Sequence, residues 1–384
     1  MKQFSRISII LFSSILLFAS AGFTSTASAQ TIKIKQKWSK LKLVKNKKGY
    51  DMNLDKTTAN GRDGYGHMNV SLDQVQINSY ETSGRKIGFN TYAWLPFLDD
   101  KYNSSIRSNK PGNQLSNPQS FALLNDMIYT VWSTGSNKGY ITKFPKNLPG
   151  GMQAKNNDFR SAYWYKYNSS PSYVNNGYQS AGADDFFNQM SISGLMTIGH
   201  GQTLSTDGQN LYMLRDTDYK HANLRGTGKS IKLYKYDANL NTVQHWSFKL
   251  RNSTSKYEYN PHTLAMVDAN HFYLGIVGNL SGNYKASYII FKGTINGTKV
   301  SVKPAFRVKQ KVGKYLQSIT YSRALNRLYL VGDNSFVGVD LGNYKSYSTK
   351  IVNNTRETEG MTFDGADGYL LFNSYPELIK GSFY

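Results

Sequence analysis

The 384-residue sequence contains no cysteine and comparatively few acidic residues. The absence of cysteine excludes disulfide bonds, thiol chemistry and cysteine-ligated metal sites. Asp and Glu total 24 against 46 Lys and Arg, which gives a formal net charge of +22. A field of one sign raises the rate of encounter with polyanions, but it does not select among them.

The sequence also lacks the short motifs that mark common enzymes. It has no Gly-x-Ser-x-Gly elbow, no P-loop, no dinucleotide fingerprint and no His-Glu-x-x-His pattern. No arrangement of residues therefore demands a catalytic function, and we expect no cofactor and no histidine-based metal site.

Only one long apolar run is present, and it lies near the start. Lys2 and Arg6 precede the run from Ile9 to Phe18, and Ala27-Ser28-Ala29 forms a small-residue cleavage site. We therefore interpret residues 1–29 as a secretory signal peptide, and expect an extracellular protein with no transmembrane segment after cleavage. Outside a bacterium the abundant polyanions are anionic wall polymers, lipids and acidic polysaccharides. Nucleic acid suits the charge but not this compartment.

The most regular feature of the sequence is a short phrase that occurs five times. A polar residue and a small residue lead into an apolar stretch, a turn follows, and a Tyr-centred apolar run comes next. The five copies start at Gln119-Ser120, Gln202-Thr203, His262-Thr263, Gln317-Ser318 and Glu359-Gly360, and their tyrosines are Tyr129, Tyr212, Tyr273, Tyr329 and Tyr369. A strand–turn–strand unit repeated at such spacing predicts a radially stacked β array.

The distances between successive copies set the number of blades. They are 83, 60, 55 and 42 residues, and the shortest matches the roughly 40–45 residues of one four-stranded blade. We therefore predict an all-β fold, a five-bladed β-propeller over residues 116–384. A six-bladed propeller is the alternative, because two ordinary blades would also fill the longest gap.

The region before the repeats divides into two parts. Residues 30–50 form a cationic arm with eight lysines, in which Ile32 and Ile34 alternate with Lys33 and Lys35. This period of two puts apolar groups on one strand face and ammonium groups on the other. The arm either grips an anionic polymer or is a solvated edge strand whose lysines prevent aggregation. Residues 51–115 are expected to form a β region that is a first blade or completes the last one.

If each repeat starts the innermost strand of a blade, its polar residue faces the propeller axis. The five side chains are then a candidate ligand-binding collar in the channel: Gln119, Gln202, His262, Gln317 and Glu359. The structural alternative is that they bond to one another, to channel water and to strand ends, as buried polar groups require.

Two weaker candidates involve carboxylates. Glycosidases need two carboxyl groups beside the scissile bond, and Arg215-Asp216 is similar to the Arg-Asp pair of five-bladed furanosidases, with Glu359 as the acid. The residue after that pair is Thr217 rather than proline, and no Trp-Asp motif precedes it. The turn Asp364-Gly-Ala-Asp367 offers carboxylates for Ca²⁺, although Asp-Gly is first of all a hairpin signal.

An aromatic stretch in the longest gap is the better candidate for carbohydrate binding. Tyr163, Trp164 and Tyr165 belong to an insert rich in Tyr, Asn and Ser. Rings on a loop at the propeller rim would stack on sugar faces. Alternatively, they cover the outside of neighbouring blades.

The repeat phrases resemble those of the helveticin-type large bacteriocins and related extracellular proteins of lactic acid bacteria. The matching pieces are Gly199-His-Gly-Gln-Thr-Leu-Ser-Thr-Asp-Gly208, His262-Thr-Leu, Gln317-Ser-Ile and Thr358-Glu-Gly-Met361. The resemblance implies a secreted propeller that acts at bacterial envelopes, with antagonism toward related bacteria. The family places acids at several of these positions, of which this chain has only Glu359. A noncatalytic binder of cell-envelope glycopolymer is thus the leading expectation, with a glycoside hydrolase or a structural surface protein as alternatives.

Overall fold

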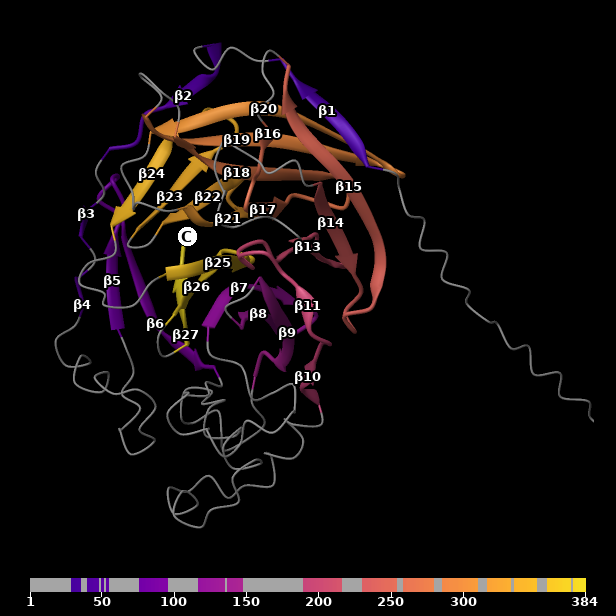
Figure 1. The fold of residues 1–384 in the computed structure, drawn as a ribbon. Coiled ribbons are helices and arrows are strands. Elements are labelled where there is room, and N and C mark those ends of the chain that lie inside the picture. Colours follow the sequence, from indigo (N-terminus) through magenta and orange to yellow (C-terminus); the bar gives the residue numbers. More distant parts are fainter. Residues whose placement is uncertain are drawn as a thin grey trace, which may run out of the picture.

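The computed structural model describes five sheets arranged around a common axis (Figure 1). The described residues are 29–35, 40–47, 50–51, 53–54, 76–95, 117–134, 137–147, 189–215, 230–253, 258–279, 285–309, 316–332, 335–350, 358–373 and 376–384. Within these ranges, no helix has the length and hydropathy that a membrane crossing requires. Residues 1–28 of the predicted signal peptide (1–29) lie outside them.

Each sheet is one blade, and in blades 1 to 4 the strands after residue 116 run outward from the axis in chain order. Blade 1 contains β7 (Asn117–Leu124), β8 (Met127–Ser133) and β9 (Lys138–Pro145), and both β10 (Ser191–Ile192) and β11 (Met196–Thr197) pair with β9. Blade 2 contains β12 (Ser205–Thr206), β13 (Leu211–Arg215), β14 (Ile231–Tyr236) and β15 (Thr242–Asn252), with β16 (Glu258–Tyr259) paired to β15.

Blades 3 and 4 are regular four-stranded meanders. Blade 3 contains β17 (Thr263–Met266), β18 (His271–Asn279), β19 (Lys285–Asn296) and β20 (Lys299–Lys309). Blade 4 contains β21 (Leu316–Ser322), β22 (Arg327–Gly332), β23 (Ser335–Asp340) and β24 (Ser346–Lys350).

Blade 5 is assembled from both ends of the chain. Its inner strands are β25 (Thr358–Asp364), β26 (Asp367–Phe372) and β27 (Glu377–Ser382), and its outer strands are β6 (Lys86–Trp94), β5 (Gln76–Tyr80) and β4 (Asn53–Leu54). β6 pairs antiparallel with β27, so the N-terminal region completes the last blade. The chain is a five-bladed β-propeller, and the six-bladed alternative is wrong.

The Tyr-centred runs are the second strands of the blades, and each blade buries both of its faces. In β8, Ile128 and Trp132 belong to the core shared with blade 5, whereas Tyr129 and Val131 belong to the core shared with blade 2. One apolar cluster fills each of the five interfaces between neighbouring blades. Burial on both faces explains why these strands read as continuous apolar runs rather than as alternating patterns.

The N-terminal segment forms a strap along the outside of three blades. β1 (Gln30–Ile34) pairs parallel with β15, β2 (Lys42–Val44) with β20, and β3 (Tyr50–Asp51) with β24. These indigo strands lie on the outer rim of the ring in Figure 1. The strap therefore covers part of the sheet edges that would otherwise present unpaired backbone groups.

Ring closure places a buried polar pair between β6 and β27. The Thr91 hydroxyl donates a 2.6 Å hydrogen bond to Oε1 of Glu377, whose side chain is fully buried. Thr91→Val removes this donor to a buried carboxyl group, and we expect it to lower the free energy of unfolding by about 1–3 kcal/mol. The urea unfolding midpoint would measure the loss. Thr91→Ser keeps the hydroxyl and is the matched control; equal losses in both variants would contradict the assignment.

The buried repeat tyrosines predict instability in alkali. Burial raises the pKa of Tyr129 and of Tyr329 from 10.0 to about 12. A raised pKa means that their contribution to stability is complete below pH 10 and is lost as the pH rises toward 12. The free energy of unfolding should fall in this window by up to about 1.4 kcal/mol per pH unit for each tyrosine.

Tyr329→Phe removes one titrating group, so its free energy of unfolding should decline less steeply between pH 10 and 12. Urea titrations at fixed pH values would show the difference. Tyr384→Phe, at a side chain that is 82% exposed, is the control for the loss of a phenol hydroxyl from the surface. A slope that is the same in Tyr329→Phe and in the unmodified protein would contradict the expectation.

Candidate functional site

The five polar residues of the repeats occupy equivalent places at the inner ends of the blades. Gln119, Gln317 and Glu359 lie within β7, β21 and β25. His262 immediately precedes β17, and Gln202 lies just before β12. Each of these innermost strands contacts the next around the ring, so the five residues surround one axis. We call this set of five residues the axial collar.

A β-bulge aims the polar side chain in three of the blades. The pairing of β7 with β8 passes from Pro118–Trp132 to Ser120–Val131 and skips Gln119. The same shift skips Gln317 in β21 and Glu359 in β25. A bulge leaves one extra residue outside the ladder and turns its side chain away from the regular alternation. The small residue that follows each polar residue is the one that resumes the pairing.

In blades 2 and 3 the collar residue precedes the innermost strand, and hydrogen bonds outside the regular ladder lie beside it. In blade 3 the His262 amide donates to the Gly275 carbonyl at 3.3 Å, although the register partner of Gly275 is Thr263. In blade 2 the Thr203 hydroxyl both donates to the Leu214 carbonyl and accepts from its amide, each at 3.1 Å. In blade 2 a hydroxyl group therefore takes over part of the ladder beside the collar.

A glycine is required at position 201, just before Gln202, because the backbone there has a positive φ angle and passes close to Gln119. Its φ angle is +85°, a conformation that side chains with a Cβ atom rarely adopt. A Cβ atom here would lie 3.0 Å from the Cβ atom of Gln119. Its carbonyl oxygen also accepts a hydrogen bond from Ser120, which ties the start of one repeat to the start of the next. The positive φ angle and the close contact with Gln119 are the physical reasons for the second glycine of the Gly199-His-Gly-Gln-Thr phrase.

The collar side chains are buried and bonded within the protein. Their exposed fractions run from 2% at Glu359 to 6% at His262. The Gln202 amide donates to Oε1 of Gln317 across blade 3, and His262 Nε2 lies 3.0 Å from the Leu316 carbonyl. Oε1 of Glu359 accepts a 2.9 Å hydrogen bond from Asn373. This bonding is what the structural alternative predicts, and a channel ligand would have to replace it.

The described part of the chain places only one of the two proposed hydrolase carboxylates. Glu359 lies in the collar, whereas Asp216 is outside the described residues, as are the aromatic candidates Tyr163, Trp164 and Tyr165. The structure therefore describes no distance between the carboxyl groups of Asp216 and Glu359, on which a glycosidase mechanism would depend.

The candidate calcium turn is a β-hairpin. Asp364 and Asp367 are register partners at the end of the β25–β26 ladder, joined by Gly365 with φ of +59° and Ala366. Asp364 forms an ion pair with Lys146, and Asp367 lies 2.7 Å from the Lys380 ammonium group. The hairpin interpretation of this Asp-Gly signal is confirmed. Among the described residues, no group of three or more His, Asp or Glu side chains is arranged to hold a metal ion.

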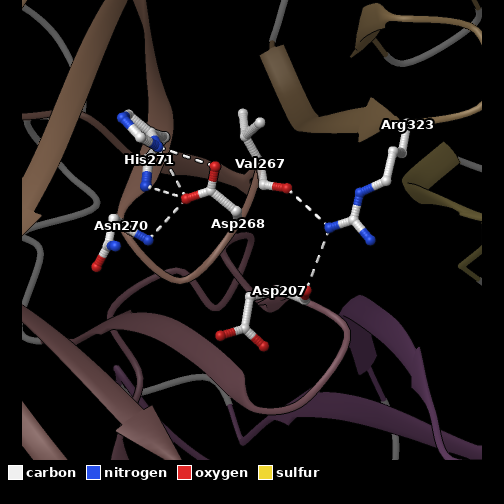
Figure 2. Close-up of polar contacts among 6 residues, drawn as sticks. All are labelled: Asp207, Val267, Asp268, Asn270, His271 and Arg323. Atoms are coloured by element: carbon white, nitrogen blue, oxygen red, sulfur yellow. Dashed lines mark hydrogen bonds and ion pairs between the residues drawn. The ribbon is translucent and has the colours of Figure 1, made fainter.

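The opposite ends of the inner strands carry a contact that the sequence did not indicate. Figure 2 shows Arg323, in the β21–β22 turn, donating to the carbonyl oxygens of Val267 at 3.0 Å and Asp207 at 3.3 Å. These acceptors belong to the turns of blades 3 and 2, so one guanidinium group links three blades.

Burial opposes ionisation of Asp268, but amide hydrogen bonds from Asn270 and His271 hold its pKa below the ordinary value. The Asp268 carboxylate thus caps its turn by accepting the hydrogen bonds of these two backbone amides.

The hydrogen bond between the side chains of Gln202 and Gln317 can be tested with a double-mutant cycle. Both side chains are buried, with 3% and 4% exposure. Each single substitution to Leu should lower the free energy of unfolding by about 1–3 kcal/mol, because the remaining amide loses a buried partner. The double variant should lose less than the sum of the two, and urea titrations of all four proteins measure this coupling. Additive losses would contradict a direct bond.

Comparisons with known proteins add little to these contacts. No protein-family model matches the chain, and no curated protein matches it. Among solved structures, the chain is similar to a nidogen/laminin complex at 10% identity, with 78% of this chain and 86% of that chain covered and a TM-score of 0.33. It is also similar to the WD40 domain of Neurospora crassa Pan2 at 10% identity, covering 77% and 96%, with a TM-score of 0.33. A putative gluconolactonase matches at 10% identity over 47% and 56%, with a TM-score of 0.29. The five-bladed assignment rests on the strand pairing.

Proposed function

We propose that this protein is a secreted, noncatalytic binder of anionic glycopolymers of the bacterial cell envelope. The observation that carries the proposal is the arrangement of charge on the N-terminal strap. Its described lysines, at positions 33, 35, 40, 42, 45 and 47, are all exposed, and residues 29–35 and 40–47 contain no acidic residue, although β3 carries Asp51. Fixed, solvated ammonium groups of one sign attract polyanions at long range.

The chemistry of the axial collar supports the noncatalytic part of the proposal. Its side chains are amides, an imidazole and one carboxyl group, all nearly buried and engaged in protein hydrogen bonds. Such groups are suited to holding the inner strands in register rather than to turnover of a substrate. Selectivity for a sugar is assigned to the aromatic stretch at Tyr163, Trp164 and Tyr165, which lies outside the described residues.

The signal-like N-terminus and the resemblance to helveticin-type bacteriocins support the extracellular setting of the proposal. The same resemblance supports an antagonistic role toward related bacteria, in which envelope binding is the first step. Both parts depend on sequence patterns rather than on contacts in the fold.

Binding to a charged polymer should depend on salt. Because bound ammonium groups release counterions, the logarithm of the binding constant should fall linearly with the logarithm of salt concentration. Co-sedimentation with purified cell wall, at sodium chloride concentrations from about 50 to 500 mM, would measure this slope. Retention that ignores ionic strength, or no retention at low salt, would contradict the proposal. So would turnover of fructan or arabinan that is abolished by Glu359→Gln.

A further inference from the structure

The described acidic residues gather at one end of the propeller. Seven of the twelve Asp and Glu residues in the described ranges lie in or beside the turns that join the first strand of a blade to the second, or the third to the fourth. They are Asp126, Asp207, Asp237, Asp268, Asp340, Asp364 and Asp367. Successive strands of a blade are antiparallel, so all of these turns lie at the same end of the axis. The axial collar lies at the other end, where the innermost strands begin.

The collar end of blade 2 carries cations instead. Arg215 is the last residue of β13, and its register partner is Lys232, near the start of β14. Lys249 and Arg251 lie near the end of β15, and Lys33 of β1 is the register partner of Arg251. Because β12 runs away from the collar, β13, β15 and β1 all end at the collar end, and β14 begins there.

Strand pairing places these five cations on one face of the sheet. Register partners project to the same side, so Arg215 lies beside Lys232, and Lys232 lies beside Ser247. Lys249 and Arg251 follow Ser247 at intervals of two residues, which keeps them on that side. The partner of Arg251 in β1 continues the same face.

The cores on the two sides of the sheet agree with this orientation. Phe248 and Leu250, which alternate with the cations of β15, pack into the core shared with blade 3. Met213, two residues before Arg215, packs into the core shared with blade 1. The cations therefore lie on the face that is turned away from blade 3. We call this set the blade 2 row: Arg215, Lys232, Lys249, Arg251 and Lys33.

The blade 2 row is accessible and crosses four strands. Lys33 and Arg251 are exposed, and the other three side chains are half-buried. Within the strands of this sheet, Glu258 is the one acidic residue, and it is the register partner of Arg251 in β16. Four neighbouring strands span about 14 Å, which suits an extended chain of anionic groups better than a single compact anion.

Arg215 is held in place before any ligand arrives. Its Nε donates to the Thr197 carbonyl at 2.9 Å, and its Nη1 donates to the Tyr236 hydroxyl at 3.3 Å. The guanidinium carbon also lies 4.3 Å from the centroid of the Tyr234 ring. These contacts leave Nη2 without a hydrogen-bond partner among the described residues, so it can donate to an anion. A cation that is already fixed loses little conformational freedom on binding.

We propose that the blade 2 row binds a linear anionic glycopolymer, which lies across the collar end of blade 2. This inference rests on the proposed function and names the part of the molecule that performs it. Ammonium and guanidinium groups form charge-assisted hydrogen bonds with the carboxylate or phosphate groups of such a polymer. The carboxylates at the opposite end of the axis repel the same polymer, so the propeller approaches it with the collar end first.

Matched charge variants of the full chain test the location. The row variant carries Lys33→Gln, Lys249→Gln and Arg251→Gln. The control variant carries Lys292→Gln, Lys299→Gln and Lys303→Gln, exposed lysines on the face of blade 3 that is turned away from blade 2. Both variants lose the same net charge. Far-ultraviolet circular dichroism and urea midpoints equal to those of the unmodified protein establish that both fold.

The probes are purified cell wall and heparin, each titrated at several salt concentrations. We expect the row variant to bind both probes at least about tenfold more weakly at about 50 mM salt. Its salt slope should be smaller by about two, on the order of 0.7 for each lost contact. The control variant should differ from the unmodified protein by less than about threefold. A variant with Lys33→Arg, Lys249→Arg and Arg251→Lys should retain binding.

A single substitution shifts binding in the opposite direction. Glu258→Gln removes the carboxylate beside Arg251 and keeps all five cations of the row. It should tighten binding to both probes by roughly two- to fivefold at low salt, since a like charge no longer repels the polymer. This variant tests the row even if the triple variant fails to fold. Unchanged or weaker binding would contradict the proposal.

The contrary outcomes separate the location from the function. Equal losses in the row and control variants would overturn the blade 2 row but leave envelope binding intact, because net charge alone would then explain it. A loss confined to the control variant would place the polymer on blade 3 instead. Failure of the unmodified protein to bind cell wall at low salt would overturn the proposed function itself.

Discussion

The fold depends on one constraint, which is that every blade is apolar on both faces. Within β8, Trp132 packs toward blade 5 and Tyr129 toward blade 2, and both are fully buried. A single blade has no way to cover both faces by itself, so its burial is complete only when a neighbour lies on each side. The pairing of β27 with β6, more than 280 residues away in the chain, supplies the last neighbour. Closure of the ring is therefore the condition under which all five interfaces become stable.

Closure also explains why the axis is occupied by bonded polar groups. Five inner strands that converge on one axis leave space for side chains but not for a second apolar layer. The bulges at Gln119, Gln317 and Glu359 direct polar side chains there, and their amides and carboxyl groups must then find partners inside the protein. The collar holds the inner ends of the blades, and Arg323 performs a similar task at the opposite ends. Contacts at both ends of the axis thus contribute to closure of the ring.

The sequence predicted the parts of this fold that depend on local pattern. The repeated phrase located the second strands with their buried tyrosines, and the alternation of Ile32 and Ile34 with lysines predicted a two-faced strand. It did not predict the strand partners of the strap, since β1 and β15 are separated by more than 200 residues and parallel pairing leaves no turn signal between them. Nor did it predict the bulges, because a bulge is a property of two paired strands and not of one. The link through Arg323 was missed because an arginine in a turn has no local feature that identifies acceptors in two other blades.

The sign of the charge on the strap separates the two interpretations of its lysines. An exposed sheet edge needs charge to resist pairing with another chain, and lysine serves that purpose well. Edge protection alone, however, gives no reason to exclude acids from residues 29–35 and 40–47 of the strap, since a mixture of signs would protect the edge with less internal repulsion. The strap also places Lys33 directly beside Arg251, which Glu258 of β16 flanks on its other side. An anion that lies across the exposed strap lysines would relieve the repulsion among them, and this is the physical reason to assign the strap to a polyanionic ligand.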